Sequence, residues 1–279
     1  MAHPSDMTAW TEIRCQRGHA DHAVRSVRVD LARRHAYADY AQVPKRIARA
    51  WTMLVWDALQ HPVDGGPYCP AHDAVSETIL TTGIWEPPET ILVAEVLSSE
   101  PGLFVDLGCQ IGWYSMLALA CGARVIALDA DEANLRLATM SAAKQSHHGF
   151  EAVRARIGVD AVDLGPLPIR LAKIDVEGAE SLALDVLAPS LGAGTVDHLL
   201  IEVTPTFKPG NHYPDLVCGL RDRGYEVALV PPKALPPASY HDPEQYLDRI
   251  DPLGDRALRD VIGRCGQAMV WFRREGASW

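Results

Sequence analysis

Two stretches of the chain combine carboxylates with glycines, and both could take part in binding or catalysis. Residues 106–112 read D-L-G-C-Q-I-G and follow a short apolar run that is typical of a buried strand. Residues 173–180 read K-I-D-V-E-G-A-E and end a second such run. Ligands of open α/β sheets bind beyond the carboxyl ends of parallel strands. We therefore expect the two stretches to border one binding site.

The first stretch predicts a loop that holds a nucleoside-bearing cofactor. Its glycines, Gly108 and Gly112, precede an apolar pattern with helical spacing. The next strand, residues 124–128, leads to Asp129, whose carboxylate could accept hydrogen bonds from both hydroxyls of a ribose. Asp106, at the end of the first strand, could bind a ligand ammonium or orient the loop.

The middle of this loop argues against a dinucleotide. Dinucleotide-binding loops read G-x-G-x-x-G, and the middle glycine lets the backbone approach a pyrophosphate. Here Cys109 and Gln110 stand where that glycine is needed. A wider loop around a smaller group is therefore favoured, and a nicotinamide-dependent oxidoreductase is disfavoured.

The second stretch brings further carboxylates to the same edge of the sheet. Asp175 and Glu177 are two residues apart, so in an extended chain their side chains face the same way. Gly178 then lets the chain turn into a helix, and Glu202 ends the neighbouring strand. With Asp129, these residues form a row of carboxylates along one rim.

The whole pattern predicts an α/β fold with a Rossmann-like, doubly wound, seven-stranded sheet, whose last two strands form an antiparallel pair around a long insertion. The expected strands are residues 103–106, 124–129, 151–157, 169–175, 198–202, 225–230 and 267–272. The expected helices are residues 87–97, 114–120, 131–138, 179–187 and 215–223.

Residues 1–75 differ from the rest and contain no convincing strand. A helix is expected from Val43 or Pro44 to about residue 59, so we interpret residues 1–75 as a helical N-terminal extension that caps a domain of residues 76–279. Four ligands for a structural zinc ion could come from this region, although the spacing is unfamiliar and surface histidines with unpaired thiols are the alternative. The candidates are Cys15, His19, His22, Cys69 and His72.

Composition narrows the partners and the compartment. The net charge of −10 argues against a protein that binds nucleic acid through its phosphates. No apolar run approaches the roughly 20 residues that a membrane helix needs, and the first residues lack the pattern of a signal peptide. Six scattered cysteines without a C-x-x-C pair suit reduced thiols, so a cytoplasmic location is expected.

The motifs together resemble a known family. D-x-G-x-x-x-G followed by a strand that ends in an acid resembles the S-adenosylmethionine (SAM) loop of class I methyltransferases. With K-I-D-V-E-G-A-E, the chain from about residue 76 to 203 resembles the FkbM family of SAM-dependent methyltransferases. Further matches are the G-x-W-E-P at 83–87 and the I-E-V at 201–203. The family usually reads D-V-G-A-N-I-G in the loop and F-E-P at the acid, where this chain has Leu128-Asp129-Ala130; the amide and the carboxylate are kept.

The resemblance implies a class I methyltransferase fold, SAM as the cofactor and O-methylation of a hydroxyl on a small-molecule natural product or sugar. It implies catalytic or substrate-orienting roles for Asp175 and Glu177. The implied cofactor-binding residues are Glu86, Asp106, Gly108, Cys109, Gln110, Gly112, Asp129 and Ala130.

Several alternatives stay open. A divalent cation could lie among Asp175, Glu177 and Glu202 and lower the pKa of the acceptor hydroxyl. Asp175 could instead only brace the SAM loop, and Glu86 could simply be favoured near a helix N-terminus. A nucleic-acid methyltransferase is disfavoured by the charge and by the lack of an N-P-P-Y or D-P-P-Y motif, whereas a methyltransferase acting on a macromolecule stays an alternative. A catalytically silent SAM-fold partner protein is the remaining class.

Overall fold

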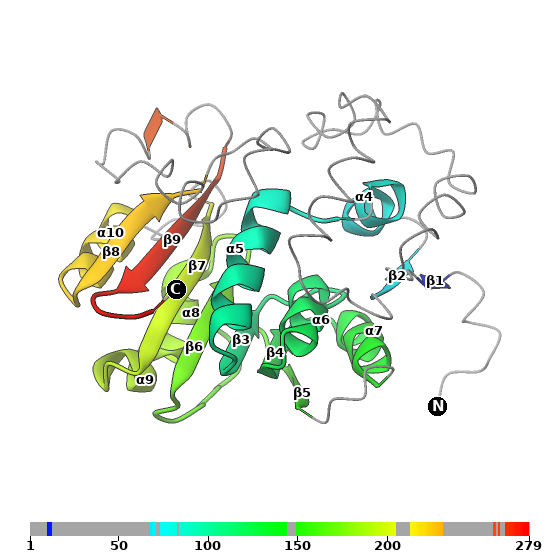
Figure 1. Cartoon of the computed structure of the whole chain (residues 1–279), viewed down its shortest axis with the longest axis horizontal. Helices are drawn as coiled ribbons and strands as arrows, with labels where there is room; N and C mark the ends of the chain where they lie inside the picture. Colours follow the sequence, from blue (N-terminus) through cyan, green and yellow to red (C-terminus); the bar gives the residue numbers. More distant parts are fainter. Residues whose placement is uncertain are drawn as a thin grey trace.

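A computed structural model of the chain gives the architecture (Figure 1). It describes residues 10–12, 67–70, 73–82, 84–143, 149–204, 213–230, 259–260, 262 and 266–278.

The centre of the molecule is a mostly parallel seven-stranded sheet in the order β5-β4-β3-β6-β7-β9-β8. Strands β3 to β7 run parallel, whereas β9 pairs antiparallel with both β7 and β8. The strands are β3 (Leu103–Leu107), β4 (Arg124–Asp129), β5 (Phe150–Arg154), β6 (Ile169–Ile174), β7 (Val196–Val203), β8 (Tyr225–Leu229) and β9 (Ala268–Arg274). The doubly wound, seven-stranded sheet expected from the sequence is confirmed.

Helices cover both faces of the sheet, as Figure 1 shows for α5, α6 and α7 in front of the strands. That layer comprises α5 (Pro87–Ser99), α6 (Trp113–Ala120) and α7 (Glu132–Ala142). The other face packs against α8 (Glu180–Val186), α9 (Ala188–Gly192) and α10 (Tyr213–Arg221). Helical crossovers of this kind are what parallel neighbours require.

The side chains of β3 show why this strand lies at the centre. Successive side chains of a strand point to opposite faces, so Phe104 enters the core under α5 and α6 while Val105 enters the core under α8. Both side chains are fully buried. An uninterrupted apolar run such as Leu103-Phe104-Val105 is therefore the pattern of a strand covered on both sides.

Some elements differ from the sequence-based expectations. The expectation of no strand within residues 1–75 is wrong, because β1 (Trp10–Glu12) pairs antiparallel with β2 (Tyr68–Pro70). Helix α4 (Ala74–Thr82) was not expected, and the proposed domain boundary at residues 75/76 falls inside it. Strands of three residues are too short to show a periodicity in the sequence.

Most residues behind the N-terminal predictions lie outside the described part of the chain. The helix from residue 43 or 44 to 59, and the helical extension built on it, lie outside the described residues. So do Cys15, His19, His22 and His72 of the zinc hypothesis, whereas Cys69 is buried in β2. None of the helices that the structure describes is long and apolar enough to cross a membrane.

A buried polar network closes the amino edge of the sheet. His198 of β7 is fully buried, and its Nε2 lies 2.9 Å from the carbonyl oxygen of Ser278. Arg170 of β6 donates to the same carbonyl at 3.0 Å and pairs with Asp197 at 3.3 Å. Burial lowers the pKa of His198 from 6.5 to about 4, so the folded protein keeps this imidazole neutral.

The neutral His198 should make stability depend on pH. Because the unfolded chain binds a proton on this residue from pH about 6.5 downward and the folded chain only near pH 4, the free energy of unfolding falls as the pH falls through this window. We expect a loss of about 2 kcal/mol between pH about 8 and about 5 from this residue alone. Denaturant unfolding of wild type and His198→Gln at both pH values measures it. The two proteins should differ in pH dependence by that amount, and parallel pH profiles would contradict the assignment.

Candidate active site at the carboxyl edge of the sheet

The loop between β3 and α6, residues 108–112, is the cofactor loop predicted from the sequence. Gly108 has a φ of +88°, and a Cβ at this position would lie 1.8 Å from the carbonyl oxygen of Asp175. Gly112 caps α6 at a φ of +84°, and a Cβ there would lie 2.9 Å from Cβ of Ala138. Both glycines are therefore required by close approach as well as by backbone conformation.

Asp129 fastens the cofactor loop to the end of β4. Its Oδ2 accepts a hydrogen bond from the backbone N–H of Gln110 at 2.8 Å. Its Oδ1 accepts from the backbone N–H of Asp131 at 2.7 Å and from the side chain of Asn134 at 3.4 Å. The carboxylate that the sequence assigned to a ribose thus also sets the shape of the loop beside it.

Three predicted site residues have strained backbones. Glu86, Gln110 and Glu177 adopt φ values of 40°, 48° and 51°, and they are the non-glycine residues with positive φ in the described part of the chain. Left-handed conformations cost non-glycine residues of the order of 1–3 kcal/mol and gather at functional sites. The strain therefore lies where the sequence predicted binding and catalysis.

A cluster of three carboxyl groups lies above the centre of the sheet, and we call Glu86, Asp175 and Glu202 the carboxyl cluster. One oxygen of each lies within 4.8 Å of the others. They come from the residue before α5, the residue after β6 and the end of β7. Glu86 is the N-cap residue of α5 but makes no side-chain hydrogen bond to the helix, so both interpretations of this residue stay open.

Two further side chains, those of Lys173 and Tyr114, contact the carboxyl cluster. Neither residue was expected at the site from the sequence. The Lys173 ammonium lies 2.6 Å from Oδ2 of Asp175 and 4.7 Å from the centroid of the Tyr114 ring. The Tyr114 hydroxyl donates to Oε2 of Glu86 at 2.7 Å. The available signal was a lysine inside the apolar run of β6, since a charged residue in a strand buried on both faces needs a partner.

The charges inside the cluster are unequal. Burial works against the ionised form of Asp175, but Lys173 and a hydrogen bond with Glu202 outweigh it and lower the Asp175 pKa. Burial and the charge of Asp175 raise the pKa of Glu202 to about 10, so Glu202 holds the proton of that hydrogen bond. Gln267, the residue before β9, donates a hydrogen bond from its side-chain amide to Oε1 of Glu202 at 2.6 Å.

Two more buried carboxyl groups surround the cluster. Burial, with the charge of Glu86, raises the pKa of Glu89 to about 8. Burial raises the pKa of Asp106 to about 6, although Lys173 and a 2.7 Å hydrogen bond from Ser115 oppose the shift. Asp106 is 1% exposed, which favours the loop-orienting role over direct contact with a ligand.

Glu177 is not a member of the carboxyl cluster. The expectation of an extended chain here is wrong, because β6 ends at Ile174 and Glu177 turns into the left-handed region. Its side chain is exposed, although burial of part of it and the charge of Asp175 raise its pKa. Glu180 fixes the turn by accepting a hydrogen bond from the backbone N–H of Gly178 at 2.7 Å.

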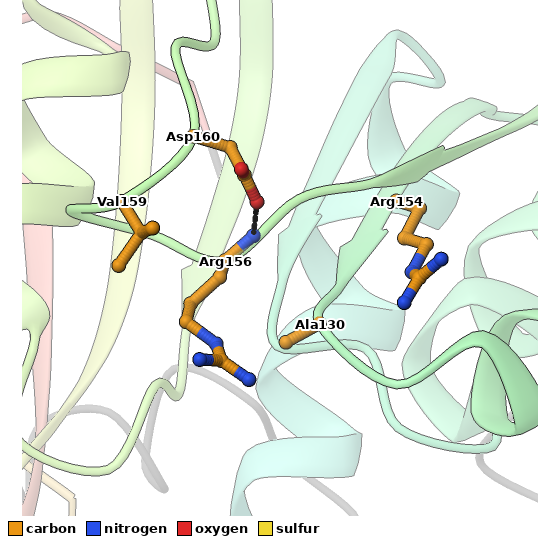
Figure 2. Close-up of a pocket in the computed structure, with 5 residues that line it drawn as sticks. All are labelled: Ala130, Arg154, Arg156, Val159 and Asp160. Atoms are coloured by element: carbon orange, nitrogen blue, oxygen red, sulfur yellow. Dashed lines mark hydrogen bonds between the residues drawn. The ribbon is translucent and has the colours of Figure 1, made fainter.

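A surface pocket of about 350 Å³ opens beyond the end of β4 (Figure 2). In this view Ala130 lies between the Arg154 and Arg156 side chains. Asp160 holds the wall of the pocket by accepting a 2.7 Å hydrogen bond from the backbone N–H of Arg156. Val159 also lines the pocket and is 71% exposed. Three of the five lining residues are therefore charged, and Ala130 and Val159 are the apolar ones.

Cys109, in the cofactor loop, is not a nucleophile. Its thiol is buried, and burial together with the charges of Asp106 and Asp129 raises its pKa well above the usual range. The thiol stays protonated and contacts the Gln110 carbonyl oxygen at 3.6 Å. Cys109 therefore contributes backbone shape to the loop.

The carboxylates that could bind a divalent cation differ from those expected from the sequence. Among the described residues, the carboxylates that could share a cation are Glu86, Asp175 and Glu202, so Glu86 takes the place expected for Glu177. Three oxygens from separate segments are a donor set that Mg²⁺ or Mn²⁺ accepts. The Lys173 ammonium, however, already contacts Asp175.

Comparison with known proteins finds only distant structural likenesses. No family model matches the chain, and no curated protein matches it. The magnesium protoporphyrin IX methyltransferase of Synechocystis, solved with bound SAM, is 16% identical over 83% of this chain and 97% of its own, with a TM-score of 0.43. An rRNA methylase from Streptococcus thermophilus is 14% identical over 64% of this chain and 92% of its own, with a TM-score of 0.40.

A third similar structure is a precorrin-6Y C5,15-methyltransferase from Geobacter metallireducens. It is 14% identical over 52% of this chain and 75% of its own, with a TM-score of 0.39. Likeness at this level says nothing about substrate. The sheet order itself, with β9 antiparallel between β7 and β8, is that of the Rossmann-like class I methyltransferase fold.

Gly108→Ala tests the contact between the cofactor loop and the segment after β6. A methyl group at this position meets the Asp175 carbonyl oxygen and the backbone is left-handed, so we expect a loss of at least about 2 kcal/mol in the free energy of unfolding. Gly192→Ala is the matched control, because that position in α9 has open space and an ordinary φ. Denaturant unfolding compares the two. Equal stability of both variants would contradict the close approach.

Proposed function

We propose that the chain is a SAM-dependent methyltransferase of the FkbM type that methylates a hydroxyl group of a small molecule. The observation that carries the proposal is the position of the carboxyl cluster beside a glycine loop fastened by Asp129, at the carboxyl edge of the sheet. Ligands of open α/β sheets bind at this edge. Because the composition is acidic, we also propose that the enzyme is cytoplasmic and acts on neither nucleic acid nor membrane.

The charge of the site supports SAM over a dinucleotide. Five carboxyl groups, those of Glu86, Glu89, Asp106, Asp175 and Glu202, lie around one ammonium, that of Lys173. SAM carries an ammonium, a sulfonium and one carboxylate, so its net charge is positive. A pyrophosphate is negative, and the one ammonium among these groups is already paired with Asp175. Opposite charge on ligand and site is the simpler match.

The donor set also suits the parts of SAM. Asp129 offers carboxylate oxygens for the ribose hydroxyls, and the pocket of about 350 Å³ beside Ala130 offers room and polar side chains for the adenine. Residues 108–112 offer backbone groups for the methionine portion, and the close packing of Gly108 and Gly112 against the protein fixes the shape of that loop. The carboxyl cluster would then lie toward the sulfonium and the acceptor.

Asp175 is the proposed general base. Bound SAM supplies an electrophilic methyl group. Asp175 is held ionised by Lys173, so its carboxylate can take the proton of an acceptor hydroxyl as the oxygen–methyl bond forms and the sulfur–methyl bond breaks, with S-adenosylhomocysteine as the leaving group. Alignment of the reactants contributes up to about 7–11 kcal/mol to such reactions, and a base adds about 10²–10⁴-fold. Exposed Glu177 is proposed to orient the acceptor at the rim.

Asp129→Ala should abolish the ribose contacts. Because hydrogen bonds to a charged group contribute about 1.5–3 kcal/mol each, we expect SAM affinity to fall by at least about 10-fold. Calorimetric titration with SAM measures the change, with S-adenosylhomocysteine and NAD as comparators. Asp131→Ala is the control, since Asp131 caps α7 through the N–H of Ala133 and should affect stability alone. Binding of NAD without SAM would refute the proposal.

Asp175→Asn separates catalysis from binding. The variant keeps the size of the side chain but lowers its basicity, so kcat should fall by about 10²–10⁴-fold while the dissociation constant of SAM stays near that of wild type. Asp185→Asn, at an exposed site on α8, should leave both unchanged. Methyl transfer is followed with radiolabelled SAM once an acceptor is found. Full activity of Asp175→Asn would assign Asp175 to bracing the loop instead.

A further inference from the structure

Lys173 occupies the position from which a cation could act on the whole carboxyl cluster. It is 2% exposed, and it extends from β6 at the strand's carboxyl end. Within the described part of the chain, its charge is the only cationic one that acts on each of the five buried carboxyl groups of the site. An ammonium buried to this degree persists only if anions surround it.

Two contacts hold the ammonium group of Lys173 in place. Asp175 lies 2.6 Å away on one side, and the face of the Tyr114 ring lies 4.7 Å away on another. The ring is itself held by the 2.7 Å hydrogen bond from its hydroxyl to Glu86. A chain of contacts therefore joins Glu86, Tyr114, Lys173 and Asp175, and Glu202 extends it through the hydrogen bond with Asp175.

This geometry resembles a metal centre in its carboxyl groups, with an ammonium in contact with one of them. Three carboxyl oxygens from separate segments converge, as ligands of a divalent ion do. A lysine supplies one positive charge and three donors, whereas Mg²⁺ or Mn²⁺ would supply two charges and six coordination positions. Because Lys173 supplies only one positive charge, Asp175 and Glu202 together retain one proton, which lies in the hydrogen bond between them.

We propose that Lys173 is a built-in cation that takes the place of a divalent metal in the carboxyl cluster and positions Asp175 for a metal-independent methyl transfer. The inference rests on the proposed function for its catalytic meaning, but the occupancy of the cluster can be tested separately. Lys173 does not itself touch the reacting atoms in this scheme, so it is a positioning residue.

Removal of the ammonium should create a metal site. Lys173→Met keeps much of the volume of the side chain without its charge, and so leaves the carboxyl cluster without a cation. We expect wild type to show no saturable binding of Mn²⁺ by calorimetry or electron paramagnetic resonance. We expect Lys173→Met to bind one Mn²⁺ per chain, at least about 10-fold more tightly than any binding by wild type.

The controls separate the cluster from adventitious binding. Lys173→Arg keeps the positive charge and should stay silent toward Mn²⁺. Adding Glu202→Gln to Lys173→Met should remove the new site, because it takes away one of the three carboxyl oxygens. A purely structural role for Lys173 would lower stability in the Met variant without a gain of metal binding.

The outcomes decide the inference either way. The proposed role of Lys173 is overturned if the folded Lys173→Met protein shows no saturable binding of Mn²⁺. It is also overturned if wild type binds Mn²⁺ at a site that Asp175→Asn abolishes. Lys173→Gln replaces the Met variant if the latter fails to fold. Should neither fold, chelation with EDTA decides: wild type that keeps its SAM affinity and turnover supports the inference, and loss of either overturns it. A wild type that binds no SAM refutes the proposed function, while the Mn²⁺ measurements still decide the role of Lys173.

Discussion

The cofactor loop and the segment after β6 share one backbone contact, and the geometry of the site depends on it. Gly108 stands against the carbonyl oxygen of Asp175 so closely that no side chain fits between them. The N–H of Asp175 in turn donates to the carbonyl of Leu107 at 2.9 Å, which continues the β3–β6 ladder to the edge of the sheet. The cofactor loop and the candidate base are therefore positioned as one unit, and a shift of either would move the other.

Charge is the second constraint on this edge. A protein seldom buries several carboxyl groups together, because each loses its hydration and repels the others. Here the cost is limited in two ways. Lys173 compensates the charge of Asp175, and Glu202 keeps a proton at neutral pH. The result is one ionised carboxylate beside a neutral one, which is a pair suited to taking up a proton from one side while a hydrogen bond steadies it from the other.

Much of the fold and part of the site could be predicted because the signals were local. The alternation of apolar runs with helical patterns defined the sheet, and the glycines and Asp129 follow directly from strand ends. The roles of Lys173 and Tyr114 could not be predicted, because their contacts join β6 to α6, elements 50 or so residues apart in the chain. Glu177 was misjudged for a local reason: the sequence did not show that the chain leaves the extended conformation before it.

The position of β9 has a consequence for how the molecule comes into being. This strand is made last among those of the sheet, yet it lies between β7 and β8 and pairs with both. During synthesis, β7 therefore leaves the ribosome before β9, and the edge of β7 that pairs with β9 stays unpaired until β9 has emerged. The residue that donates to Glu202, Gln267, arrives with the same late segment. A nascent chain could thus form the loop at residues 108–112 early, whereas Glu202 gains its hydrogen bond from Gln267 only after the last strand has emerged.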